Sequence, residues 1–188
     1  MILPYIKKCC IAASLIATSN LSASEITSSP NGQVKSIFEV KNGSPVYSVE
    51  YKNKSIIADS ALGFDLQLAP DLIKNFKITD IKTDAVNEKW EQPWGEDRLI
   101  TNKYNETLIT LTQQDKLSRQ LILCFRSFDD GIAFRYEFPT QENLKDFVIM
   151  DELTEFTLQE NGQAWHLPAM SKDRYEYLYQ KQSLKDLE

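Results

Sequence analysis

Residues 119–139 read RQLILCFRSFDDGIAFRYEFP, a stretch that predicts a β-hairpin. The first arm, 121–125, is apolar throughout, as expected for a strand buried on both faces. Asp-Asp-Gly at 129–131 suits a tight turn in which Gly131 takes a positive φ. The return arm alternates, with its large apolar side chains at Ile132, Phe134, Tyr136 and Phe138. Such a strand needs a second layer to cover one face, which favours two packed sheets.

The rest of the chain supplies short strand candidates separated by turns. They span residues 34–40, 46–51, 55–57, 61–68, 76–86, 107–112, 147–150 and 155–158. In the fourth candidate, Leu68 would share an apolar face with Leu62, Phe64 and Leu66. Residues 71–76 fit either one helical turn or a loop. No long segment has helical periodicity with caps at both ends, so the pattern predicts an all-β, antiparallel β-sandwich.

Charge and composition limit the classes of partner. The 188 residues are 42% hydrophobic and 26% charged, with a net charge of −6. This is the balance of a globular domain, and its negative sign argues against nucleic acid or an anionic membrane as partner.

The N-terminus has the pattern of a secretory signal peptide. Lys7 and Lys8 precede a short apolar run at 9–17, and small residues follow at 22–24. A frayed N-terminal helix is the alternative. We expect residues 1–24 to be removed, leaving a secreted or periplasmic domain of residues 25–188 with a charge of −8 and no transmembrane segment. Cys124 would then be the single cysteine, and its apolar surroundings predict a buried structural thiol rather than a reactive one.

The least ordinary stretch is WEQPWGE, residues 90–96. Indole faces stack on sugar rings and carboxylates accept bonds from hydroxyls, so Trp90 and Trp94 could form a carbohydrate-binding surface. Alternatively, both indoles cap the end of the sandwich core. Large aromatic side chains more often supply buried area than a site, which favours the second interpretation.

A second aromatic region surrounds Trp165 and Glu176. Trp165 is a further candidate for sugar stacking, and the adjacent His166 is the single histidine, without a predictable catalytic partner. Glu176 lies between two tyrosines, either as an exposed strand residue or as an oxygen ligand for a hard cation. Because Ca²⁺ takes about six to eight oxygens, one carboxylate gives a half-site at most.

Several of these motifs, in this order, resemble the N-terminal domain of glycoside hydrolase family 97, which comprises secreted α-glucosidases and α-galactosidases. The matching segments are SPNG at 29–32, YSVEYKNK at 47–54, WEQPWGE at 90–96, YNE at 104–106, DGIAFRYEFP at 130–139 and YEY at 175–177. The resemblance covers nearly the whole chain after the leader.

The resemblance implies a β-supersandwich, similar to the galactose-mutarotase fold, packed on a catalytic (β/α)₈ barrel. The barrel would hold the catalytic residues and most of the Ca²⁺ ligands, and Glu176 matches the ligand that the N-terminal domain supplies. The family's N-terminal domain runs considerably further than Glu188, so the resemblance implies that this chain is an incomplete domain. Such a domain would be inactive alone. It would act on an oligo- or polysaccharide only as part of the full enzyme.

Two other functions stay open from the residues. One is an autonomous periplasmic carbohydrate-binding module that uses Trp90, Trp94 and Trp165. The other is a structural sandwich without a ligand. This chain lacks a sheet region that the family has. An autonomous module should end after a complete domain, so the missing region favours the enzyme domain over the module.

Overall fold

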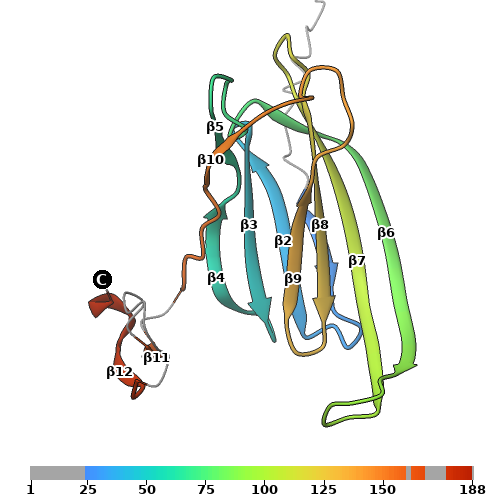
Figure 1. Ribbon diagram of the computed structural model, residues 1–188, viewed down its shortest axis with the longest axis vertical. Coiled ribbons are helices and arrows are strands. Elements are labelled where there is room, and N and C mark those ends of the chain that lie inside the picture. The colour runs from blue at the N-terminus through green and yellow to red at the C-terminus, as the bar shows by residue number, and fades with distance from the viewer. Residues whose placement is uncertain (1–23, 160–161, 168–176, 188) are drawn as a thin grey trace, which may run out of the picture.

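A computed structural model describes residues 24–159, 162–167 and 177–187. Its body is two four-stranded antiparallel sheets packed face to face, with strand orders β1-β2-β3-β4 and β6-β7-β8-β9 (Figure 1). The predicted all-β, antiparallel sandwich is therefore confirmed. In the described part of the chain, no helix has the length and hydropathy to cross a membrane.

The first sheet is a meander of hairpins. Its strands are β1 (Glu25–Ser28), β2 (Val34–Lys41), β3 (Ser44–Tyr51) and β4 (Lys54–Ala61). Buried and part-exposed residues alternate along β2 and β3, as a sheet with one covered face requires. The tight turns between strands carry the positive φ angles, at Asn42, Lys52 and Asn53 among others.

The second sheet contains the predicted hairpin. Its strands are β6 (Phe76–Glu91), β7 (Leu99–Gln113), β8 (Gln120–Phe128) and β9 (Ile132–Glu137). The positive φ predicted for Gly131 is wrong. The Phe128 N–H donates to the Gly131 carbonyl at 2.8 Å, so Asp129 and Asp130 make the turn and the glycine follows it.

The second layer covers the aromatic strand as expected. The ring of Phe125 on β8 lies 6.0 Å from Phe38 on β2 and 6.2 Å from Tyr47 on β3, measured between centroids. Phe134 on β9 lies 5.2 Å from Tyr47. These ring contacts join the two sheets and form the centre of the hydrophobic core.

One end of the sandwich is closed by β5 (Phe64–Leu66), which pairs with β10 (Ile149–Glu152). In the stretch 71–76, residues 71–75 form a loop rather than a helical turn, and β6 begins at Phe76. Leu72 in this loop bonds back to Phe64. The predicted inward position of Leu68 is wrong. The strand ends at Leu66, Leu68 takes a φ of 57°, and its side chain is fully exposed.

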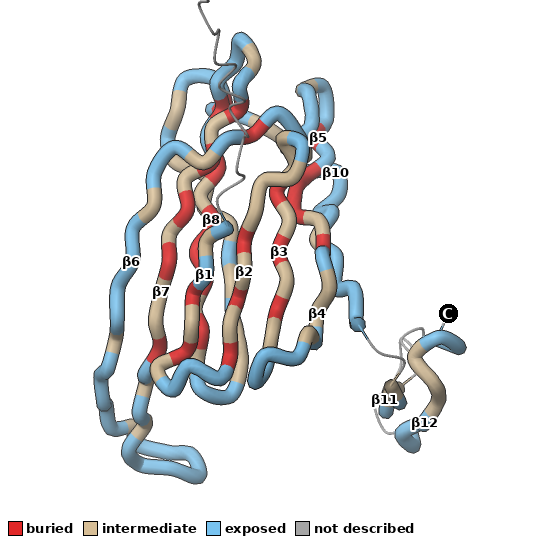
Figure 2. The backbone as a smooth tube through the Cα atoms, turned by 180° about the vertical axis from the view of Figure 1, so that it is seen from behind, coloured by how far each residue is buried: buried red, intermediate tan, exposed pale blue. Residues whose placement is uncertain are grey.

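The two sheets are offset sideways. In Figures 1 and 2, β6 extends beyond β1 on one side and β4 extends beyond β9 on the other. The predicted strand at 155–158 runs along the free edge of β4, where Ala58 N–H donates to Thr157 O at 2.8 Å and Glu155 N–H to Ala61 O at 3.0 Å. The strand predicted at 147–150 is present as β10, shifted towards the C-terminus.

A small hairpin lies beyond β4. It consists of β11 (Gln163–His166) and β12 (Gln180–Ser183), followed by a 3₁₀ turn at Leu184–Asp186 (Figure 1).

Candidate functional site

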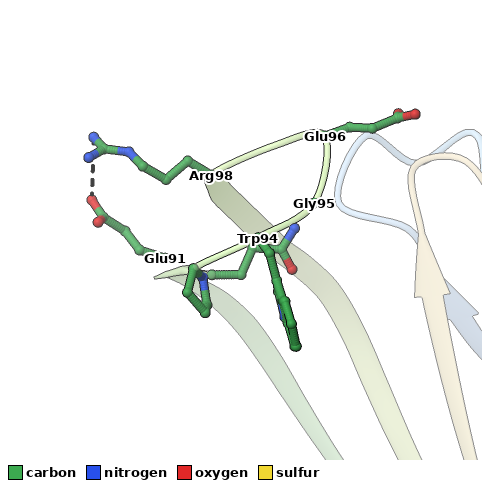
Figure 3. A pocket seen from close by; sticks show the side chains of 7 residues that line it. Glu91, Trp94, Gly95, Glu96 and Arg98 are labelled. Carbon is green, nitrogen blue, oxygen red and sulfur yellow. Dashed lines mark ion pairs between the residues drawn. The ribbon is translucent and has the colours of Figure 1, made fainter.

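The β6–β7 hairpin forms an arm that projects from the sandwich. Its strands pair from Phe76 opposite Gln113 to Glu91 opposite Leu99, with one register shift between Ile78 and Asp80. Residues in the outer half of β6 are mostly exposed, because no strand of the first sheet lies opposite them. The arm ends in the loop 92–98, which carries most of the WEQPWGE motif (Figure 3).

Hydrogen bonds within the loop fix its shape. The Gln92 N–H donates to Arg98 O at 2.9 Å, and its side-chain amide donates to Asp97 O at 2.8 Å. Arg98 Nη2 lies 3.7 Å from Glu91 Oε1 across the base of the loop. Gly95 takes a φ of 118° and packs on Gln92, where a Cβ would come within 2.5 Å of Nε2. The loop therefore holds a defined conformation although it is exposed.

Both tryptophans of the motif are exposed. The exposed fraction is 84% for Trp94 and 46% for Trp90. The interpretation that these indoles cap the core is therefore wrong, because the arm carries them past the end of the sandwich. Trp94 and Pro93 line an open pocket of about 510 Å³ with Glu91, Glu96 and Arg98. Figure 3 shows that the Trp94 indole projects from the loop, away from the Glu91–Arg98 ion pair.

This arrangement offers an aromatic face beside carboxylate, amide and guanidinium groups. An exposed, preorganised indole can stack on the apolar face of a sugar ring while the polar groups bond its hydroxyls. The pocket is shallow and lies on one loop, which suits a binding surface rather than an enclosed reaction centre.

Trp165 does not join this surface. It lies on β11, on the β4 side of the sandwich, whereas the loop 92–98 lies on the β6 side (Figure 1). Trp165 is 66% exposed, and Lys181 Nζ lies 5.2 Å from the centroid of its ring. The three tryptophans therefore cannot contact one small sugar together.

The predicted metal ligand, Glu176, lies outside the described residues. Within residues 24–159, 162–167 and 177–187, no three His, Cys, Asp or Glu side chains are grouped to hold a metal ion.

A charged cluster on the outer face of the second sheet was not singled out from the sequence. Glu106 on β7 accepts bonds from Arg126 Nε at 2.5 Å and from the Cys124 thiol at 3.1 Å, and Arg135 Nη1 lies 3.9 Å away. Burial alone would raise the pKa of Glu106, but these bonds and the two guanidinium charges outweigh it and lower the pKa. The register places Arg126 opposite Glu106, and the sequence does not specify that register.

Cys124 is buried, as predicted. Burial first, and then the Glu106 carboxylate, raise the pKa of its thiol to about 11. The thiol is therefore protonated at neutral pH, and a protonated buried thiol is a poor nucleophile.

Fold and surface define a two-sheet β-sandwich domain with an exposed aromatic arm. Residues 27–188 match the family model described as glycosyl-hydrolase 97 N-terminal. The chain therefore belongs to the N-terminal domain family of glycoside hydrolase family 97, which confirms the resemblance carried by its motifs.

Solved structures agree with this assignment. The chain is 36% identical to a family 97 enzyme from Pseudoalteromonas sp. strain K8 in complex with panose, with a TM-score of 0.82 over 86% of this chain and 25% of that one. The acarbose complex of a Pseudoalteromonas family 97 enzyme gives 36% identity and 0.80, covering 84% and 24%. A β-arabinopyranosidase gives 25% identity and 0.70, covering 83% and 26%. The chain thus spans about a quarter of the length of these relatives.

Proposed function

We propose that the chain is the non-catalytic N-terminal domain of a secreted or periplasmic family 97 α-glycosidase, with residues 1–24 as its signal peptide. In that enzyme the sandwich packs on a (β/α)₈ barrel, which carries out hydrolysis of an oligo- or polysaccharide. The observation that supports this best is the match of residues 27–188 to the family's N-terminal model, together with the quarter of the relatives' length that the chain covers. The panose and acarbose complexes point to α-linked glucosides as the substrate class.

The proposed domain also contributes Glu176 to a Ca²⁺ site completed by the barrel. A carboxylate gives at most two of the roughly six to eight oxygens that Ca²⁺ takes. Bound there, the cation would supply positive charge at that site. Glu176 would hold part of its shell and so couple the domain to the barrel.

Calcium binding provides the test of this role. The isolated chain should show no Ca²⁺ binding by titration calorimetry below roughly millimolar concentration, and Glu176→Gln should change nothing there. In the full-length enzyme, the same substitution should weaken Ca²⁺ binding by roughly tenfold or more and lower activity at limiting Ca²⁺. The variant Glu142→Gln, at an exposed carboxylate of the sandwich, serves as the control. Micromolar binding by the isolated chain would contradict a shared site.

A second candidate function, an autonomous carbohydrate-binding module, is favoured by the exposure of Trp94 in its preorganised loop. A module of this kind should give a saturable change in tryptophan fluorescence with maltose-type oligosaccharides at roughly millimolar affinity. Trp94→Ala should abolish that change, and Trp165→Ala should leave the binding constant as it was. No response to millimolar sugar removes the module, and equal loss in both variants would contradict a site on the arm.

A further inference from the structure

The overhanging edge of the first sheet carries apolar side chains, and no strand of the described residues lies opposite them. Leu158 bridges to Ile57 on β4, and the side chains of Phe156 and Leu158 are 63% and 50% exposed. Phe156 still touches the core margin, with its ring 6.3 Å from both Tyr47 and Phe134. An inward-facing sheet surface therefore remains in water beside β9.

The edge of β9 next to this surface has backbone groups that no other described residue pairs with. Because Phe128 N–H donates to Gly131 O, the antiparallel alternation pairs residues 133, 135 and 137 with β8. The N–H and C=O groups of Ile132, Phe134 and Tyr136 then point to the open edge. Within the described residues, β9 is the last strand of its sheet and no further strand pairs with it.

The uncovered space beside the edge of β9 has a defined boundary at each end. At one end, Tyr136 Oη bonds to Thr154 Oγ1 at 2.7 Å. At the other end an apolar groove of about 640 Å³ opens, lined by residues that include Val49, Ile57 and Ile132, with Asp129 and Asp130 at its rim. We call the space between these limits, bordered by β9 and residues 155–158, the β9 slot.

The opposite overhang is different in character. Beyond β1, the pocket over β6 and β7 is about 490 Å³ and is lined mainly by polar residues such as Thr83, Asn105 and Thr107. Polar side chains of this kind are stable in water without a cover, whereas the apolar surface of the β9 slot is not. The asymmetry identifies the β9 slot as the place where a further element is needed.

We propose that the β9 slot binds one added β-strand, contributed by the part of a family 97 enzyme that this chain does not span. The strand would pair with the free groups of β9 and cover Phe156 and Leu158 with apolar residues at alternate positions. A Lys or Arg would lie near Asp129 and Asp130. The proposal rests on the proposed function, and it names the element through which the rest of the enzyme joins the sandwich.

A second copy of the chain fits the slot poorly. Antiparallel pairing of two β9 edges relates the copies by a twofold axis normal to the sheet, so both first sheets lie on the same side. Each β4 edge extends past β9 (Figures 1 and 2), and the two overhangs would occupy the same space. A strand without an attached sheet avoids that collision.

Peptide binding tests the slot directly. The labelled chain is applied to overlapping peptides that cover the remaining three quarters of the Pseudoalteromonas enzyme, each with a scrambled control. We expect binding confined to one or two neighbouring peptides with alternating apolar residues. Bound peptide should slow amide exchange of Ile132, Phe134 and Tyr136 by roughly tenfold or more, and leave the amides of Ala133 and Arg135, already bonded to β8, unchanged.

Variants distinguish binding in the β9 slot from nonspecific binding. Phe156→Lys combined with Leu158→Lys should reduce peptide binding by roughly tenfold or more, since both side chains are at the proposed interface. Leu68→Lys, at a fully exposed turn residue, is the matched control and should bind as the original chain does. Binding no better than scrambled peptide, equal binding by the double variant, protection outside β9, or a dimer that protects β9 without peptide would each overturn the proposal. None of these outcomes bears on the Ca²⁺ test of the domain's role.

Discussion

Arg119→Ala should lower the free energy of unfolding by about 2–4 kcal/mol, because it removes a buried side chain together with the hydrogen bonds that this side chain donates. Arg119 is 1% exposed and extends from the start of β8's arm into the closed end of the sandwich. Its guanidinium donates to Gln113 Oε1 at 2.8 Å, Pro70 O at 2.7 Å and Asp71 O at 3.2 Å. The substitution leaves a cavity, removes the Arg119 donor of the buried Gln113 side-chain oxygen, and removes two part-buried bonds to the carbonyls of Pro70 and Asp71.

Urea unfolding monitored by circular dichroism measures this loss. Arg98→Ala is the matched control, because its side chain is exposed and makes one ion pair with Glu91, worth about 0–1 kcal/mol. Arg119→Lys should fall between the two, since an ammonium reaches fewer of the three acceptors. If Arg119→Ala lowers the free energy of unfolding by less than about 1 kcal/mol, the loop 69–75 keeps its position without the hydrogen bonds of Arg119.

Gly63→Ala should destabilise the same end of the sandwich by about 2–4 kcal/mol, from overpacking together with a strained φ. A Cβ at Gly63 would come within 2.6 Å of Leu72 O and 2.8 Å of Ile73 Cγ2, at a φ of 153°. Leu72 cannot yield easily, because its N–H donates to Phe64 O at 2.9 Å and its carbonyl accepts from Phe64.

Thermal unfolding monitored by circular dichroism gives the comparison. Gly131→Ala is the control, since a Cβ there meets nothing within 4 Å and the residue has an ordinary φ. It should change stability by less than about 0.5 kcal/mol. Equal stability of the two variants would mean that the loop moves aside and that the Phe64–Leu72 bonds do not fix it.

The alternation of apolar residues was enough to predict the sandwich, because period two fixes which side chains face the core. The same alternation could not predict the offset of the sheets. The residue pattern of β4 or β6 does not specify which strand of the other sheet lies opposite it. Trp90 and Trp94 show the consequence. Their size suggested core positions, but the pairing of β6 with β7 carries them beyond the core.

The positions and partners of several charged residues also could not be predicted from the sequence. Arg119 opens the hairpin arm in a position where a polar residue usually faces water, yet it is buried by a loop distant in sequence. Likewise, Glu106 and Arg126 are 20 residues apart, and only the register of β7 with β8 brings them together. Motif resemblance identified the family, because short motifs in a fixed order do not depend on register. The metal-ligand role of Glu176 stays a prediction.

The most direct measurement is the nucleotide sequence beyond the codon for Glu188. If the chain is the N-terminal domain of a family 97 enzyme, an open frame continues, or resumes after one stop or frameshift. It should encode further strands, one of them the strand for the β9 slot, and then alternating strands and helices of a barrel. A stop codon followed by unrelated sequence would contradict the enzyme-domain role and leave the sugar-binding surface of Trp94 as the function to test.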